Sequence, residues 1–141
     1  MFDVVVVGAD DSTTARRAVA AATEMALMSG GQLHIVTAYD PKPRREKLLP
    51  DEFRYLSSDS EVAVVLQDLS FIAKHQGIEP QLHSVEGNPA DAILSKATEL
   101  NADLIVVGNQ GMHGVRRVLG SVPNSVAHGA SCSVIIVDTS E

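Results

Sequence analysis

The chain has 141 residues, a formal net charge of −7, and 45% apolar but only 4% aromatic residues. This length suits one domain, 1–141, with a core built mainly from aliphatic side chains. The negative charge argues against nucleic acid or an anionic membrane as a partner. The single cysteine excludes an intrachain disulfide, and we expect neither a signal peptide nor a membrane span, so the sequence predicts a soluble cytoplasmic protein.

Strand and helix patterns alternate along the whole chain. In chain order, apolar runs and helical periodicities predict a strand over 2–8, a helix over 12–29, a strand over 33–38, a helix over 60–76, a strand over 80–85, a helix over 88–100, a strand over 104–107, a helix over 121–130 and a strand over 133–137. Asn88 followed by Pro89 is typical of a helix start. This alternation predicts an α/β domain whose mostly parallel sheet carries helices on both faces.

Residues 40–57 interrupt the alternation with a different composition. They contain three of the six prolines and five of the eleven basic residues. This composition predicts a loop. The loop either forms a lid over a ligand or is a surface loop without a function, because long loops in compact domains are often functional but not always so.

A glycine-rich segment separates the fourth strand from the last helix. It contains Gly108, Gly111 and Gly114 and ends in Gly120-Ser121, where Ser121 is expected to cap the helix. Glycines let the backbone approach an anion closely, and a helix N-terminus offers unpaired N–H groups at the positive end of a dipole. The order of strand, glycine loop and capped helix predicts a phosphate cradle, and therefore a nucleotide-binding protein.

A second polar loop, Gly8-Ala9-Asp10-Asp11-Ser12, follows the first strand. Ligands of parallel sheets bind beyond the carboxyl ends of the strands, so both loops line one crevice if the first and fourth strands are neighbours. The first loop has no GxGxxG, and no GxxxxGK[ST] occurs in the chain. A standard dinucleotide fold and a Walker-type NTPase are therefore disfavoured.

These loops resemble those of the universal stress protein family. Gly108-x-x-Gly111, a spacer and Gly120-Ser121 are similar to the family's nucleotide loop, and the stretch from Val7 to Ser12 resembles its first-strand exit. The resemblance covers essentially the whole chain. It implies a single-domain, Rossmann-like sheet of five parallel strands in the order 3-2-1-4-5, a homodimer and, in one subgroup, bound ATP or a related adenine nucleotide.

The resemblance also implies a set of nucleotide-binding residues. Ala9, Asp10 and Ala38 would hold the adenine end, Gly108 and Gly111 would lie by the ribose and phosphates, and Gly120, Ser121 and Val122 would hold the phosphates. The chain departs from the family pattern twice, because its spacer before Gly120 is one residue shorter and Asp11 replaces the usual glycine. The Asp11 carboxylate could repel a triphosphate or hold a cation such as magnesium, but it is more simply a first-turn carboxylate favoured by the helix dipole.

Several residues allow two interpretations. Asp10 either contacts the ligand or forms an Asx turn, and Arg116 or Arg117 either clamps a phosphate or is solvated. Cys132 is expected to be a small buried hydrophobe. His113 is expected to be a surface residue of the loop, and the remaining histidines show no metal-ligand spacing: His34, His75, His83 and His128.

The function predicted from these features is that of a cytoplasmic stress-response module. It would bind ATP, AMP or a related adenine nucleotide and signal to a partner whether the nucleotide is bound. One alternative is a slow ATP hydrolase, although the chain shows no known catalytic motif. The other is a dimeric protein-interaction module that binds no nucleotide. The apolar strand 134–137 is predicted to lie at the sheet edge, where two copies would pair.

Overall fold

A computed structural model describes residues 1–40, 59–109 and 121–139 of the chain. Its strands are β1 (Val4–Gly8), β2 (Gln32–Tyr39), β3 (Gln81–Glu86), β4 (Leu104–Gly108) and β5 (Ser133–Val137). Its helices are α1 (Thr13–Ser29), α2 (Asp59–Gln76), α3 (Pro89–Leu100) and α5 (Val122–Gly129). Every predicted strand and helix is present, and their ends shift by no more than a residue or two. Nearly all of the predicted loop 40–57 lies outside the described residues.

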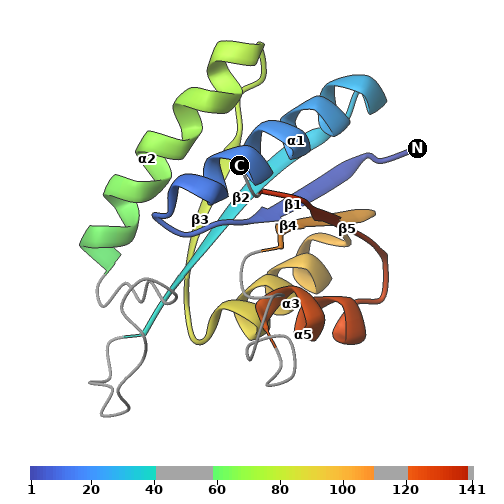
Figure 1. The fold of residues 1–141 in the computed structure, drawn as a ribbon. Helices are drawn as coiled ribbons and strands as arrows, with labels where there is room; N and C mark the ends of the chain where they lie inside the picture. The colour runs from blue at the N-terminus through green and yellow to red at the C-terminus, as the bar shows by residue number, and fades with distance from the viewer. Residues whose placement is uncertain (41–58, 110–120, 140–141) are drawn as a thin grey trace.

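The five strands form one parallel sheet in the order β3-β2-β1-β4-β5, which confirms the predicted fold. The chain starts in the central strand, moves outward through β2 and β3, and then returns to the other side of β1 to form β4 and β5. Helices α1 and α2 cover one face of this sheet, and α3 and α5 cover the other (Figure 1).

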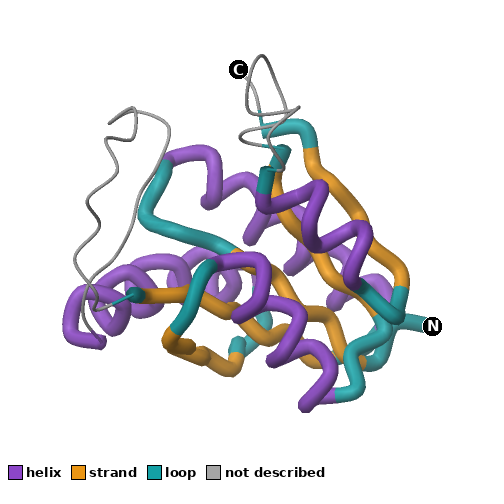
Figure 2. Tube along the Cα trace, turned by 90° about the horizontal axis from the view of Figure 1, so that it is seen from below, coloured by secondary structure: helices purple, strands orange, loops and turns teal. Residues whose placement is uncertain are grey.

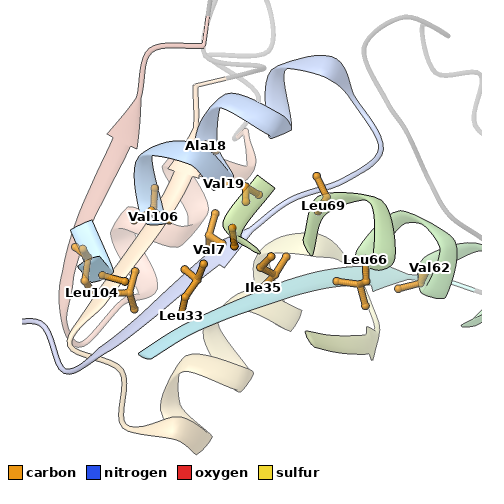
Figure 3. Close-up of a cluster of buried hydrophobic side chains, with 14 residues drawn as sticks. Val7, Ala18, Val19, Leu33, Ile35, Val62, Leu66, Leu69, Leu104 and Val106 are labelled. Atoms are coloured by element: carbon orange, nitrogen blue, oxygen red, sulfur yellow. The ribbon is translucent and has the colours of Figure 1, made fainter. Parts of the chain in front are cut away.

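The core has two apolar layers, one on each face of the sheet. In β1, Val5 and Val7 pack toward α1 and α2, whereas Val6 packs toward α3 and α5. All three side chains are fully buried, which explains why the strand is continuously apolar rather than alternating. Figure 3 shows the first layer, where Leu33 and Ile35 of β2 lie beneath the helices with Val7.

Local capping fixes the helix ends that the sequence predicts. Ser12 Oγ accepts the backbone N–H of Ala15 at 3.2 Å, and Asn88 Oδ1 accepts that of Asp91 at 3.0 Å. Gly30 ends α1 in the left-handed conformation, with a φ of 67°. Figure 2 shows from below how the helices lie across the strands that they connect.

The first strand begins at Val4 rather than at the predicted residue 2, because a side chain from a neighbouring segment caps it. Asp103 Oδ2 accepts the backbone N–H groups of Asp3 at 2.9 Å and Val4 at 2.8 Å. Asp3 is thus held by this carboxylate through its N–H, while its carbonyl accepts the backbone N–H of Gln32 at 2.8 Å. Within the described residues, no helix is both long and apolar enough to cross a membrane.

Candidate functional site

The two polar loops identified in the sequence leave adjacent strands at the same edge of the sheet. Val7 of β1 is in register with Val106 of β4, so both strands end side by side. On the other side of β1, the backbone N–H of Ala9 donates to the carbonyl of Val36 at 3.0 Å. The strand order reverses between β1 and β4, which is where open α/β sheets bind their ligands.

The structure therefore gathers the nucleoside-end candidates at this edge. Ala9 and Asp10 follow β1, and Ala38 lies two residues beyond Val36, near the end of β2. All three candidate residues are partly exposed. They are placed where the prediction requires, and their contact with a ligand stays a prediction.

Asp10 has a structural role of its own. Its Oδ1 accepts the backbone N–H of Ser12 at 2.9 Å, which makes the Asx turn that leads into α1. Ser12 then caps α1, so the two residues together define the path of the first loop. The Asx-turn interpretation of Asp10 is thus confirmed. A ligand contact by this carboxylate would have to add to the turn rather than replace it.

Gly108 is tightly packed within the protein. A Cβ at this position would lie 3.0 Å from Cγ2 of Thr139, a residue that is only 2% exposed. The same added atom would lie 3.9 Å from the Cβ of Ala18 in α1. Close approach of a ligand is therefore not the only reason for a glycine here, and the C-terminal segment already fills the space beside it.

The N-terminus of α5 supplies the phosphate end of the candidate site. Ser121 is 5% exposed, and its Oγ accepts the backbone N–H of Asn124 across 3.4 Å, which is long for a hydrogen bond. Pro123 has no N–H, so Val122 and Asn124 provide the donors of the first turn. A phosphate at this helix start would compete with Ser121 Oγ for the N–H of Asn124.

The remaining predicted phosphate-loop residues lie outside the described part of the chain. These are Gly111, Gly120, His113, Arg116 and Arg117. Their roles stay predictions, and so does the effect of the shortened spacer. Among the described residues, no group of three or more His, Cys, Asp or Glu side chains could hold a metal ion.

The structure also brings together two histidines that sequence spacing did not connect. His34 Nδ1 of β2 and His83 Nε2 of β3 lie 2.9 Å apart, and His34 Nε2 lies 3.1 Å from Oε1 of Gln32. Burial is the main reason that the pKa values of both imidazoles are below their ordinary range, and the charge of Lys96 lowers them further. One feature could have suggested this pair: both histidines are polar residues in adjacent strands, on the face of the sheet that α3 covers.

Cys132 is half-buried, so the expectation of a buried hydrophobe is only partly correct. It lines an open hollow of about 310 Å³ between α3 and α5, near the amino ends of β4 and β5. Burial, and then the nearby Asp103 carboxylate, raises the pKa of its thiol. A thiol with a raised pKa is a weak nucleophile, and this hollow lies at the opposite end of the sheet from the nucleotide-site candidates.

An open parallel sheet whose strand order reverses between β1 and β4 defines a Rossmann-like α/β protein. The universal stress protein family matches residues 1–138, and this chain belongs to that family. It is 35% identical to universal stress protein Rv1636 of Mycobacterium tuberculosis, over 98% of this chain and 97% of the relative.

Two solved structures of similar proteins carry adenine nucleotides. One is described as a universal stress protein in complex with cAMP, with a TM-score of 0.81, 36% identity, and coverage of 99% of this chain and 98% of the other. The second is a universal stress protein of Archaeoglobus fulgidus in complex with dAMP. It has a TM-score of 0.71 and 26% identity, and covers 96% and 98% of the two chains.

Proposed function

We propose that this chain binds an adenine nucleotide at the carboxyl ends of β1 and β4 and signals its occupancy to a protein partner. The observation that carries the proposal is the pairing of β1 with β4, which brings the start of the first loop beside the end of β4, where the strand order reverses. The chemistry offered there is backbone N–H groups rather than a catalytic set. A binding module therefore fits the described residues better than a hydrolase does.

The ligand class is supported by the relatives in complex with cAMP and dAMP. Both compounds are adenine nucleotides with a single phosphate. We therefore take cAMP as the first ligand to test and ATP, with and without magnesium, as the second. Asp11 is exposed in the first loop, and its charge would oppose the additional phosphates of ATP more than the single phosphate of cAMP.

The proposed contacts follow the order of the loops. Ala9, Asp10 and Ala38 face the nucleoside, Gly108 and Gly111 lie by the ribose, and Gly120, Ser121 and Val122 bind phosphate. The N-terminus of α5 favours an anion because its first N–H groups and its dipole both point to the carboxyl edge of the sheet.

The first experiment identifies what the protein carries. Denaturing the purified protein and analysing the released small molecules by mass spectrometry should yield an adenine nucleotide. Calorimetric titration with adenosine, AMP, cAMP and ATP then ranks the ligands, and phosphate release from ATP reports any hydrolysis. No released adenine compound, together with no binding of any of the four ligands, would refute the proposed function.

The phosphate end is tested by Ser121→Ala. Loss of this N-cap should weaken cAMP binding about tenfold, because a buried hydroxyl beside the anion is removed. Adenosine binding should change much less, since adenosine has no phosphate. Asn88→Ala is the matched control, because it removes the N-cap of α3, a helix that also has a proline in its first turn. It should cost about 1 kcal/mol of stability and leave both affinities unchanged.

A further inference from the structure

One side chain ties the start of the glycine loop to the end of the described chain. Asn109 Oδ1 accepts two hydrogen bonds from Thr139, one from its backbone N–H at 3.0 Å and one from its hydroxyl at 2.9 Å. Asn109 Nδ2 donates to Asp138 Oδ1 at 3.2 Å. The backbone N–H of Asn109 donates to the carbonyl of Val137 at 2.9 Å. The residue after Gly108 is thus held by three consecutive residues at the end of β5.

This set of contacts runs from a buried residue to the surface, because the hydrogen bonds to Thr139 are part-buried and the one to Asp138 is exposed. Thr139 is 2% exposed, and its Cγ2 occupies the space that a side chain at position 108 would need. Its hydroxyl therefore cannot turn to solvent without leaving that space. Asn109 is itself half-buried, so both of its amide atoms are used within the protein.

We propose that Asn109 is a positioning residue of the nucleotide site, which acts by clamping the exit of β4 to Asp138 and Thr139. The proposal rests on the function proposed above and adds the C-terminal segment to that site. A binding site keeps its geometry when hydrogen bonds behind it hold its backbone in place. Four hydrogen bonds fix Asn109, and with it Gly108, at the end of β4 beside the end of β1, so the clamp favours binding without contacting the ligand.

The clamp is tested first by Asn109→Ala, which removes all three side-chain hydrogen bonds. We expect both adenosine and cAMP to bind about tenfold more weakly in calorimetric titration, since the lost hydrogen bonds no longer fix the end of β4. Equal effects on the two ligands indicate positioning, because only cAMP carries a phosphate. Asn101→Ala is the control: it strains the left-handed cap of α3, with a φ of 54°, at the opposite end of the sheet. It should lower stability and leave both affinities unchanged.

A rescue experiment tests the partner of the clamp. Asn109→Asp keeps the acceptor for Thr139, removes the donor to Asp138 and sets two carboxylates together, so both ligands should bind more weakly. Combining it with Asp138→Asn restores one amide and one carboxylate in reversed positions, with the net charge of the wild type. We expect the double variant to bind adenosine within about threefold of the wild type.

The outcomes are separable. Wild-type affinity in Asn109→Ala, or a double variant no better than Asn109→Asp, would overturn the clamp while leaving nucleotide binding intact. Failure of the wild-type protein to bind either adenosine or cAMP would refute the proposed function, and the clamp proposal with it.

Discussion

Gly8 ends β1 at a point where α3 leaves no room for a side chain. A Cβ at this position would lie 2.2 Å from Cδ1 and 2.7 Å from Cγ1 of Ile93, which is itself 4% exposed. Gly8→Ala should therefore cost about 1–3 kcal/mol in the free energy of unfolding, because Ile93 must move within a packed layer. Urea denaturation of the variant measures this cost.

A double-variant cycle assigns that cost to Ile93. Ile93→Ala alone should cost about 2–5 kcal/mol, but in its presence Gly8→Ala should cost almost nothing, since the clashing atoms are gone. Gly30→Ala is the control, because its penalty comes from a φ of 67° with no neighbouring atom within 4 Å. Its cost should add to that of Ile93→Ala. Additive costs for Gly8→Ala and Ile93→Ala would show that the contact is not the cause.

Sequence reasoning recognises a residue's local role more easily than its long-range one. The caps at Ser12 and Asn88 were predictable because each acts within three residues along the chain. Gly30 and Gly31 follow the last residue of α1 as a local helix stop would, but a Cβ at Gly31 would lie 2.1 Å from the carbonyl oxygen of Phe2. The need for a glycine at position 31 comes from contact with the residues at the start of β1, and no pattern in the sequence near Gly31 indicates it.

At the scale of elements, α3 packs on β2, where His34 is buried, and His83 of the neighbouring strand β3 is half-buried beside it. Burial is the main cause that lowers the pKa values of both imidazoles, and the charge of Lys96 lowers them further. His34 also lowers the pKa of His83, and the Glu99 carboxylate offsets part of this lowering. Histidines of the unfolded chain titrate at about pH 6.5, so below that pH the folded protein binds fewer protons than the unfolded chain. This contribution to stability is complete above that pH and is lost as the pH falls toward the folded pKa values.

The prediction is that the unfolding free energy falls between pH 7 and pH 5, and that His83→Gln makes this fall shallower. A glutamine amide can still donate to His34 Nδ1 but does not titrate in this range. The slope that one group can contribute is limited to about 1.4 kcal/mol per pH unit. His75→Gln, at an exposed position of α2, serves as the control and should keep the wild-type slope. Identical slopes in all three proteins would refute the assignment.

Helix and strand positions were predictable because burial on one or both faces produces a regular spacing of apolar residues in the sequence. Contacts between elements were not: His34 and His83 are 49 residues apart, and only the register of β2 with β3 brings them together. The same limit applies to Asn109, whose partners lie 29 and 30 residues away. Periodicity predicted a parallel sheet with covered faces, whereas the strand order came from the family resemblance.

At the scale of the whole molecule, β5 is an edge strand whose outer side is open within the described residues. The carbonyl of Val137 accepts from Asn109 of the β4 segment, so the backbone groups of Val137 point inward. Because these groups alternate along a strand, those of Val134 and Ile136 point to the open side. The side chains of all four residues from Val134 to Val137 are only partly buried. An apolar edge of this kind favours pairing with a second copy.

We expect two copies to join their β5 edges about a two-fold axis, and Ile136→Pro tests this arrangement. Proline at 136 removes an outward-facing N–H and leaves the ladder to β4 intact, so the protein should stay folded and become monomeric in light scattering. Ile136→Ala loses most of the same side chain but keeps the N–H, and should remain dimeric. Ile135→Pro, by contrast, breaks the inner ladder and should unfold β5 itself. A folded dimer in Ile136→Pro would place the subunit contact elsewhere on the molecule.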